Sequence, residues 1–145
     1  MEKNYTINEV AVMTGLSTRT IRNYLKSGFV NGEKINGIWT VSANDFCDML
    51  GNPAIKPSIK AKHNSVVYDF LADERKKTNK ICAVIDLYAD DAEAEEISGF
   101  FCSAVNNEVI NDIIFKFEKN GRYVRVILSG SEENVIELLN RYYNE

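Results

Sequence analysis

The sequence predicts an α+β protein in which two short helices and a β-hairpin are followed by an αβαββα unit. Three observations support this prediction. Two helix starts with good capping residues lie before residue 30 and are separated by a glycine. Asn-Gly dipeptides at residues 36–37 and 120–121 each lie between two short apolar runs, the pattern of a β-hairpin. Between residues 64 and 143, helical and strand periodicities alternate.

The first two helices are defined by their ends. Thr6 and Glu9 have the spacing of a capping box, so a helix is expected to begin at about Ile7. Gly15 supplies the unhindered residue that a sharp turn needs. Ser17 is a natural N-cap for the second helix, and Gly28 ends it. A helix, a short turn with glycine and a second helix form a helix-turn-helix, whose second helix reads the major groove of DNA.

The second helix has one narrow apolar face and one basic face. Ile21 and Leu25 are four residues apart, with Tyr24 beside them. The opposite face lacks carboxylates, whereas a solvated helix normally mixes charges of both signs. This composition favours DNA binding over the alternative, an ordinary helical hairpin with a basic outer face. The polar residues of this face are Arg19, Arg22, Asn23 and Lys26.

A hairpin is expected directly after these helices. Asn36-Gly37 separates the runs 33–35 and 38–41, and Ser42 caps a further short helix. Two helices followed at once by a hairpin give a winged helix-turn-helix, whose wing lies along a phosphate backbone or dips into the minor groove. We expect Trp39 to be structural, with its ring on the small core beside Phe29 or Phe46.

Four stretches, 5–11, 14–17, 20–24 and 28–30, resemble the winged helix-turn-helix of the MerR and excisionase superfamily. The resemblance covers about residues 5–50. It implies that Ser17 to Lys26 form the recognition helix, that Lys34 to Trp39 form the wing, and that Arg22 contacts a base or the DNA backbone. Family wings often carry arginine beside the aromatic residue, but Ile38 and Thr40 stand there in this chain.

The charge distribution supports a DNA-binding head on an acidic body. Residues 1–62 hold eight Lys or Arg against five acids, and the remainder holds nine against sixteen. Such an asymmetry confines contact with phosphate to the basic part. The residues expected to bind DNA are Ser17, Thr18, Arg19, Thr20, Arg22, Asn23, Tyr24, Lys26, Lys34 and Asn36.

The domain boundary is placed at a polar segment broken by Pro53 and Pro57. Since the residue before a proline avoids the helical conformation, this segment is interpreted as a linker. Its lysines would be solvated or would follow DNA phosphate. The expected organisation is a DNA-binding head over residues 1–51, a linker over 52–63 and an α+β body over 64–145.

The body is expected to contain a helix within 64–76, a strand over 80–88, a helix over 90–106, a hairpin over 113–128 and a helix over 131–143. A two-residue loop at Asn120-Gly121 would pair Phe117 with Val124 and Phe115 with Val126. This register places all the large apolar residues of the hairpin on one face. The resulting sheet is antiparallel or mixed, with helices on one face.

No arrangement for catalysis or metal binding is evident in the sequence. Cys47, Cys82 and Cys102 lie far apart in apolar runs, as expected of small buried residues. His63 is the single histidine and has no partner for a metal site or a charge relay. We therefore expect no enzymatic activity, no cofactor and no metal.

These observations favour a sequence-specific transcriptional regulator that binds double-stranded DNA as a homodimer. One recognition helix reads only a few base pairs, so two heads on one site would raise specificity. The body would dimerise, with Ile114, Tyr123 and Ile127 on the outer sheet face as candidate contacts. A further expected role of the body is to sense a small-molecule or protein effector. The alternatives are an excisionase-like protein that bends DNA and an adaptor for an acidic protein. Without a targeting segment or a membrane span, the expected location is the cytoplasm.

Overall fold

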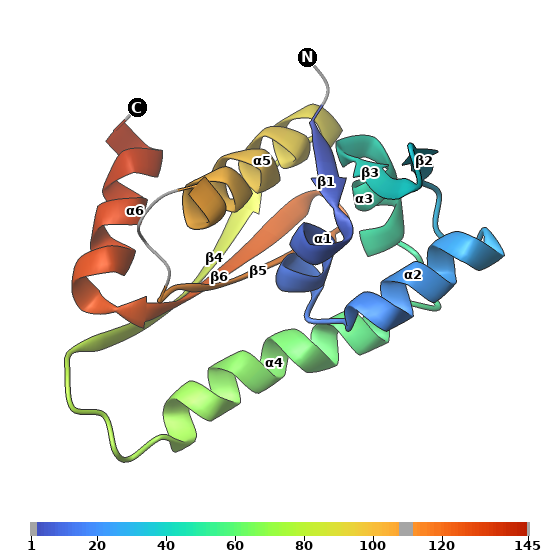
Figure 1. Ribbon diagram of the computed structural model, residues 1–145. Helices are drawn as coiled ribbons and strands as arrows, with labels where there is room; N and C mark the ends of the chain where they lie inside the picture. The colour runs from blue at the N-terminus through green and yellow to red at the C-terminus, as the bar shows by residue number, and fades with distance from the viewer. Residues whose placement is uncertain (1–2, 108–111, 145) are drawn as a thin grey trace.

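The computed structural model describes residues 3–107 and 112–144 and has the predicted α+β architecture (Figure 1). Its N-terminal part contains β1 (Asn4–Thr6), α1 (Ile7–Thr14), α2 (Thr18–Ser27), β2 (Glu33–Ile35), β3 (Ile38–Ser42) and α3 (Ala43–Leu50). It continues with α4 (Lys56–Ala72), β4 (Lys80–Tyr88), α5 (Asp91–Asn107), β5 (Ile114–Asn120), β6 (Tyr123–Ser131) and α6 (Glu132–Asn144). The second part therefore has the predicted order αβαββα. Within the described residues, no helix is long and apolar enough to span a membrane.

The head contains a strand that was not predicted. β1 pairs antiparallel with β3, and β3 pairs with β2 to complete the hairpin. Because β1 is only three residues long, it shows no periodicity that sequence reasoning could use. It places Tyr5, whose ring is completely buried, 5.3 Å from the ring of Phe46.

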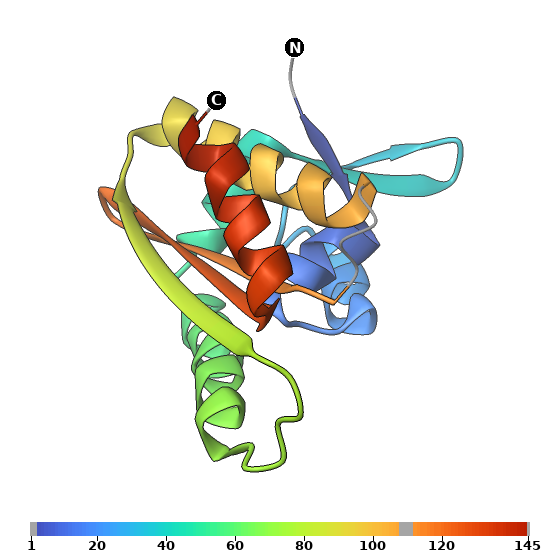
Figure 2. The ribbon, with the colours of Figure 1, turned by 90° about the vertical axis from the view of Figure 1, so that its left-hand side faces the viewer.

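The sheet of the body is wholly antiparallel, in the order β4-β6-β5. α5 and α6 cover one of its faces (Figures 1 and 2). The ring of Phe101 on α5 lies 5.8 Å from that of Phe115 on β5, and 5.0 Å from that of Tyr142 on α6. These aromatic residues join the two helices to the sheet.

The predicted register of the second hairpin is wrong by two residues. Phe117 pairs with Val126 and Asn120 pairs with Tyr123, so the loop is Gly121-Arg122. Asn120 stays in the strand, where its side-chain amide donates to the carboxylate of Glu118 at 2.8 Å. Because a shift of two residues keeps each side chain on its original face, the predicted inner face is correct.

The connector expected over residues 52–63 is largely helical, because α4 begins at Lys56. Pro57 lies in its first turn, where a missing N–H costs no hydrogen bond. Ile55, Ile59 and His63 are buried, so this segment packs on the protein and is not a solvated linker. This helix follows the head directly and lies across both parts of the molecule (Figure 1).

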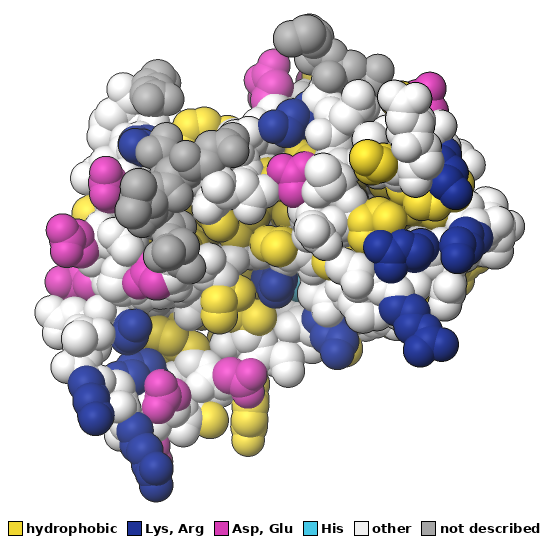
Figure 3. Space-filling view, in the orientation of Figure 1, with side chains coloured by type: hydrophobic (Ala, Val, Ile, Leu, Met, Phe, Trp, Pro, Cys, Tyr) yellow, Lys and Arg dark blue, Asp and Glu magenta, His cyan; other side chains and the backbone are white. Residues whose placement is uncertain are grey.

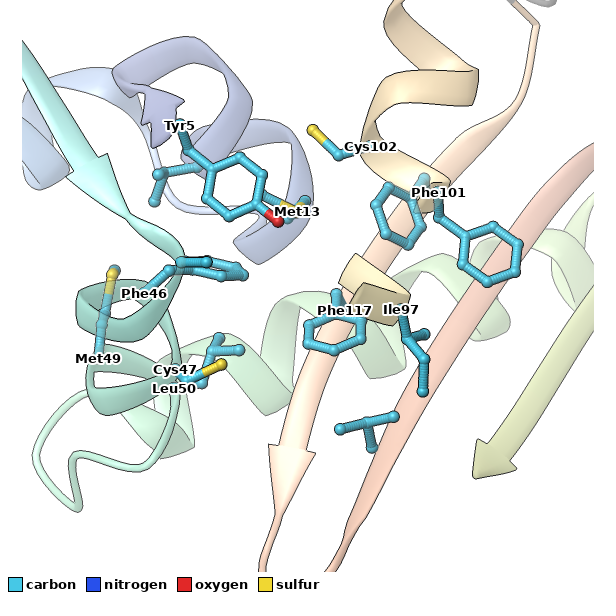
Figure 4. Packing of buried hydrophobic residues seen from close by; sticks show 14 of the residues in the cluster. Tyr5, Met13, Phe46, Cys47, Met49, Leu50, Ile97, Phe101, Cys102 and Phe117 are labelled. Atoms are coloured by element: carbon cyan, nitrogen blue, oxygen red, sulfur yellow. The ribbon is translucent and has the colours of Figure 1, made fainter. Parts of the chain in front are cut away.

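Head and body share one continuous core (Figure 4). Phe46 of α3 stacks on Phe117 of β5 with 6.3 Å between ring centroids. The hydroxyl groups of Tyr5 and Ser98 are hydrogen-bonded at 2.6 Å, and Lys3 Nζ donates to Ser103 Oγ at 2.8 Å. Polar and apolar contacts therefore fix the head on the body.

Both ring nitrogens of the buried His63 have hydrogen-bond partners from distant parts of the chain. Its Nδ1 lies 2.7 Å from Glu118 Oε1, and its Nε2 lies 3.0 Å from the carbonyl oxygen of Met13. Lys60 Nζ donates to the other carboxylate oxygen of Glu118 at 2.7 Å. These hydrogen bonds lower the pKa of Glu118 far below its ordinary value, although burial opposes them. The cluster joins α1, α4 and β5 across the boundary between head and body.

The outer sheet face proposed for dimerisation is partly covered within the chain. α1 packs on β5, and α4 packs on β5 and β6. Ile127 is only 2% exposed, whereas Ile114 is 47% exposed. Ile127, at the centre of this face, is therefore unavailable as an intermolecular contact.

Two of the three cysteines are buried, as expected. Cys47 and Cys102 lie in the core, where burial raises the pKa of each thiol to about 12. Cys82 is half-buried on β4. Because thiolates are the nucleophilic form, Cys47 and Cys102 are unreactive at neutral pH.

Candidate DNA-binding surface

α2 has the ends that the sequence predicts. Ser17 Oγ accepts the backbone N–H of Thr20 at 3.0 Å and donates to Thr20 Oγ1 at 2.9 Å. Gly28 has φ +77°, and its N–H reaches the carbonyl groups of the last turn. Glycine takes this left-handed conformation without steric cost, so both ends of α2 are well defined.

The basic face of α2 is exposed while the opposite face is buried. Ile21 is completely buried and Leu25 is 4% exposed. No acidic residue lies within α2. Figure 3 shows Lys and Arg side chains gathered over this part of the molecule. The outward side chains that define this basic face are Arg19, Arg22, Asn23 and Lys26.

Besides Ser17, which caps α2, three of the predicted site residues are partly buried. Thr18 and Thr20 are half-buried in the first turn, and Thr20 is bonded to the N-cap. Tyr24 is half-buried and packs edge-on against Phe29, with 5.2 Å between ring centroids. Only the exposed atoms of Thr18, Thr20 and Tyr24 are therefore available to contact DNA.

The β2–β3 hairpin has the predicted two-residue turn. Asn36 and Gly37 have φ values of +51° and +80°, and Ile35 pairs with Ile38. Positive φ at both positions is characteristic of a type I′ turn. Lys34 and Asn36 are exposed on this hairpin. Figure 1 shows the hairpin and α2 projecting on the same side of the molecule.

Trp39 is half-buried and packs against the core, as expected, but among the described residues it forms no ring–ring pair with Phe29 or Phe46. The Trp39 ring lies beside Gly32, and Lys34 Nζ lies over this ring, 5.6 Å from its centroid. Phe29 packs on Tyr24, and Phe46 packs on Tyr5 and Phe117. Gly32, directly before β2, lies close against α2, because a Cβ there would lie 2.6 Å from Leu25 Cδ2. Trp39 therefore supports the base of the hairpin.

α4 adds an exposed lysine beside the turn of the helix-turn-helix. Gly15 has φ +81°, and a Cβ at this position would lie 2.7 Å from Lys62 Cβ. Lys62 is exposed. The sequence offered the lysines of this segment as possible phosphate contacts but gave no indication that one of them adjoins Gly15. This contact depends on the packing of α4 against α1.

The comparisons with known proteins agree with this geometry. Residues 5–38 match the family model described as MerR HTH family regulatory protein. The N-terminal segment is thus a MerR-type helix-turn-helix, and the match supports a DNA-binding regulator in general terms. Neither the curated proteins nor the solved structures that were searched gave a match.

Proposed function

We propose that this protein is a sequence-specific transcriptional regulator that binds double-stranded DNA through α2 and the β2–β3 hairpin. The exposed, carboxylate-free basic face of α2 is the observation that carries the proposal. α2 would lie in the major groove, and the hairpin would contact the flanking backbone or minor groove. The proposed contacts are Ser17, Thr18, Arg19, Thr20, Arg22, Asn23, Tyr24, Lys26, Lys34 and Asn36, with Lys62 as a further phosphate contact.

The proposed contacts differ in the kind of bond that they can make with DNA. Arg22 and Asn23 are exposed near the middle of α2 and can offer paired hydrogen bonds to guanine and adenine, respectively. Lys26 in the last turn and Lys62 beside Gly15 are point charges suited to phosphate. Base contacts determine sequence preference, whereas phosphate contacts position the protein.

Replacement of Arg22 with alanine tests this assignment. If Arg22 reads a base, affinity for the preferred duplex falls by about 1–3 kcal/mol; if it touches phosphate, the salt slope falls by about one unit. Affinity should be measured by fluorescence anisotropy at several salt concentrations. Arg122→Ala is a matched control, because Arg122 is an exposed arginine on the β5–β6 loop.

Both variants should melt at the wild-type temperature, since neither guanidinium is buried. Equal affinity of wild type and Arg22→Ala across the salt series would contradict the proposal. So would equal losses in Arg22→Ala and Arg122→Ala, because they would indicate a general charge effect.

The regulator would act as a dimer, so that two heads read two half-sites of one operator. In this proposal the head over residues 1–51 binds DNA, and the body over residues 64–145 pairs the copies and receives any effector. The protein would work in the cytoplasm and would have no enzymatic activity.

An excisionase-like protein that bends DNA is a second candidate, favoured by the tip of the hairpin. Ile35 is 48% exposed and Ile38 is 66% exposed, on either side of the turn. Apolar side chains of minor-groove proteins wedge between base steps and kink the duplex. A gel-phasing measurement distinguishes the two candidates: a bend that disappears in an Ile35→Ser, Ile38→Ser double variant favours the architectural protein.

A further inference from the structure

β4 is a long edge strand with one unpaired side. It is the terminal strand in the order β4-β6-β5, and all nine of its residues pair with β6. At the opposite edge of the sheet, β5 is packed against α1 of the head. In the part of the chain that the structure describes, no strand pairs with the outer side of β4. We call this side the open edge.

The hydrogen bonds that flank the strand identify the residues facing the open edge. Ala89 N–H donates to the carbonyl of Arg122, and Glu132 N–H donates to the carbonyl of Asn79. Residues 79 and 89 thus belong to hydrogen-bonded pairs with β6, and such pairs alternate along an antiparallel ladder. Backbone N–H and C=O groups therefore point to the open edge at Lys80, Cys82, Val84, Asp86 and Tyr88.

β4 lacks the features that usually prevent edge strands from pairing. It contains no proline, and its pairing with β6 continues without a bulge. Its central charge is neutralised within the chain, because Arg125 donates to both carboxylate oxygens of Asp86, at 2.7 and 3.0 Å. Lys80, at the start of the strand, is the only remaining charge.

Apolar side chains on both faces of β4 remain incompletely covered. On the face away from α5 and α6, Val84 is 48% exposed and Tyr88 is 80% exposed. On the face toward the helices, Ile81, Ile85 and Leu87 are packed against the core but only half-buried. A further strand along the open edge would complete the burial of both sets.

We propose that the open edge binds the same edge of a second copy, so that two three-stranded sheets join into one six-stranded antiparallel sheet. The two-fold axis passes through Val84, which lies opposite Val84 of the other copy. In this register Cys82 is opposite Asp86 and Lys80 is opposite Tyr88. Each of the five residues whose backbone N–H and C=O groups point to the open edge then lies opposite another such residue of the second copy. The two residues of each pair can exchange backbone hydrogen bonds.

The side chains of the strand are self-complementary in this register. No two like charges face each other, and Lys80 lies diagonal to Asp86 of the second copy, within reach of a long side chain. On the helix side, Ile81 is opposite Leu87 and Ala83 is opposite Ile85. The strand thus matches itself in charge, volume and hydrogen-bonding pattern.

This pairing leaves the DNA-binding surface free. Figure 2 shows β4 and the β2–β3 hairpin on opposite sides of the molecule. The inference rests on the proposed function in one respect, because it supplies the interface of the proposed dimer. The strand pairing itself requires no DNA.

Three variants at Val84 in the full chain test the interface. Val84→Pro removes a backbone N–H that points to the open edge, without removing a hydrogen bond to β6. Val84→Lys places two ammonium groups opposite each other at the axis, where Cα atoms lie about 5.5 Å apart. Val84→Thr keeps the backbone N–H, the β-branched shape and the neutral side chain, and is the matched control.

Mass should be measured by light scattering at micromolar concentration without DNA. Wild type and Val84→Thr should have twice the 16.4 kDa mass of one chain, whereas Val84→Pro and Val84→Lys should have the mass of one chain. Circular dichroism checks that each variant is folded, and Val84→Lys decides the result if the proline variant unfolds. A monomeric wild type, or a Val84→Lys variant that remains dimeric, would overturn the inference.

DNA binding distinguishes this interface from the proposed function. Val84→Lys should bind a duplex with one half-site as wild type does, but should lose the tighter binding to a two-half-site duplex. Arg22→Ala should lose DNA affinity and remain dimeric. A dimer without DNA binding would refute the proposed function alone, and a DNA-binding monomer would refute the interface alone.

Discussion

Replacement of Phe46 with alanine should lower the free energy of unfolding by about 3–5 kcal/mol, as expected for a large buried aromatic residue. Phe46 is completely buried between Tyr5 and Phe117, with centroid distances of 5.3 and 6.3 Å. The cavity would therefore open at the contact between head and body. Urea unfolding followed by circular dichroism measures the loss.

The same variant tests whether head and body unfold together. Trp39 fluorescence reports on the head, since Trp39 is the only tryptophan, and circular dichroism reports on the whole chain. The two probes should give coincident transitions in the wild type, because the core is continuous. Phe29→Ala is the control and should cost much less, since Phe29 is 45% exposed. A head that unfolds before the body, at no cost to the body, would contradict this prediction.

Replacement of Glu118 with glutamine should cost about 3 kcal/mol at neutral pH, near the lower limit for breaking a buried ion pair. Glu118 is 4% exposed and accepts from Lys60, His63 and Asn120. The two ring nitrogens of His63 lie 2.7 Å from Glu118 Oε1 and 3.0 Å from the carbonyl oxygen of Met13. The loss is moderated because the Lys60 side chain is 38% exposed and can be rehydrated.

This cost should disappear in acid. Because the folded protein holds the pKa of Glu118 well below 4.5, its carboxylate stabilises the fold fully above that pH and progressively less below it. The difference in unfolding free energy between wild type and Glu118→Gln should therefore narrow by about 1.4 kcal/mol per pH unit below 4.5. Urea titrations between pH 7 and pH 3 measure this slope. Glu137→Gln, on the exposed surface of α6, should show no such dependence, and a constant difference in Glu118→Gln would contradict the assignment.

Local sequence features predicted the elements of the candidate DNA-binding surface. The caps at Ser17 and Gly28 depend on neighbouring residues alone, and the turn at Asn36-Gly37 depends on two residues that tolerate positive φ. Interactions between residues so close in the chain can be predicted from a single sequence. The Asn-Gly pattern also predicted a loop at Asn120-Gly121, but this loop lies one residue further along the chain, at Gly121-Arg122. Asn120 stays in the strand, where its side chain donates a hydrogen bond to Glu118.

The arrangement of head and body was not predictable in this way. His63 and Glu118 are 55 residues apart, and Tyr5 and Ser98 are 93 residues apart. Neither pair leaves a periodic pattern in the sequence. The polar segment with two prolines resembled a linker, yet Pro57 fits the first turn of α4 and the buried side chains of Ile59 and His63 fix the helix on the protein. Long-range packing decided this part of the structure.

Selection of binding sites from a pool of random duplexes tests the central claim most directly. The full chain should enrich an inverted repeat whose half-sites are read by the two α2 helices of a dimer. Arg22→Ala should lose or relax the preference at particular positions of each half-site, whereas Arg122→Ala should select the wild-type sequence. Recovery of an unenriched pool by the wild type, or of the same sequence by wild type and Arg22→Ala, would contradict the claim that α2 reads DNA.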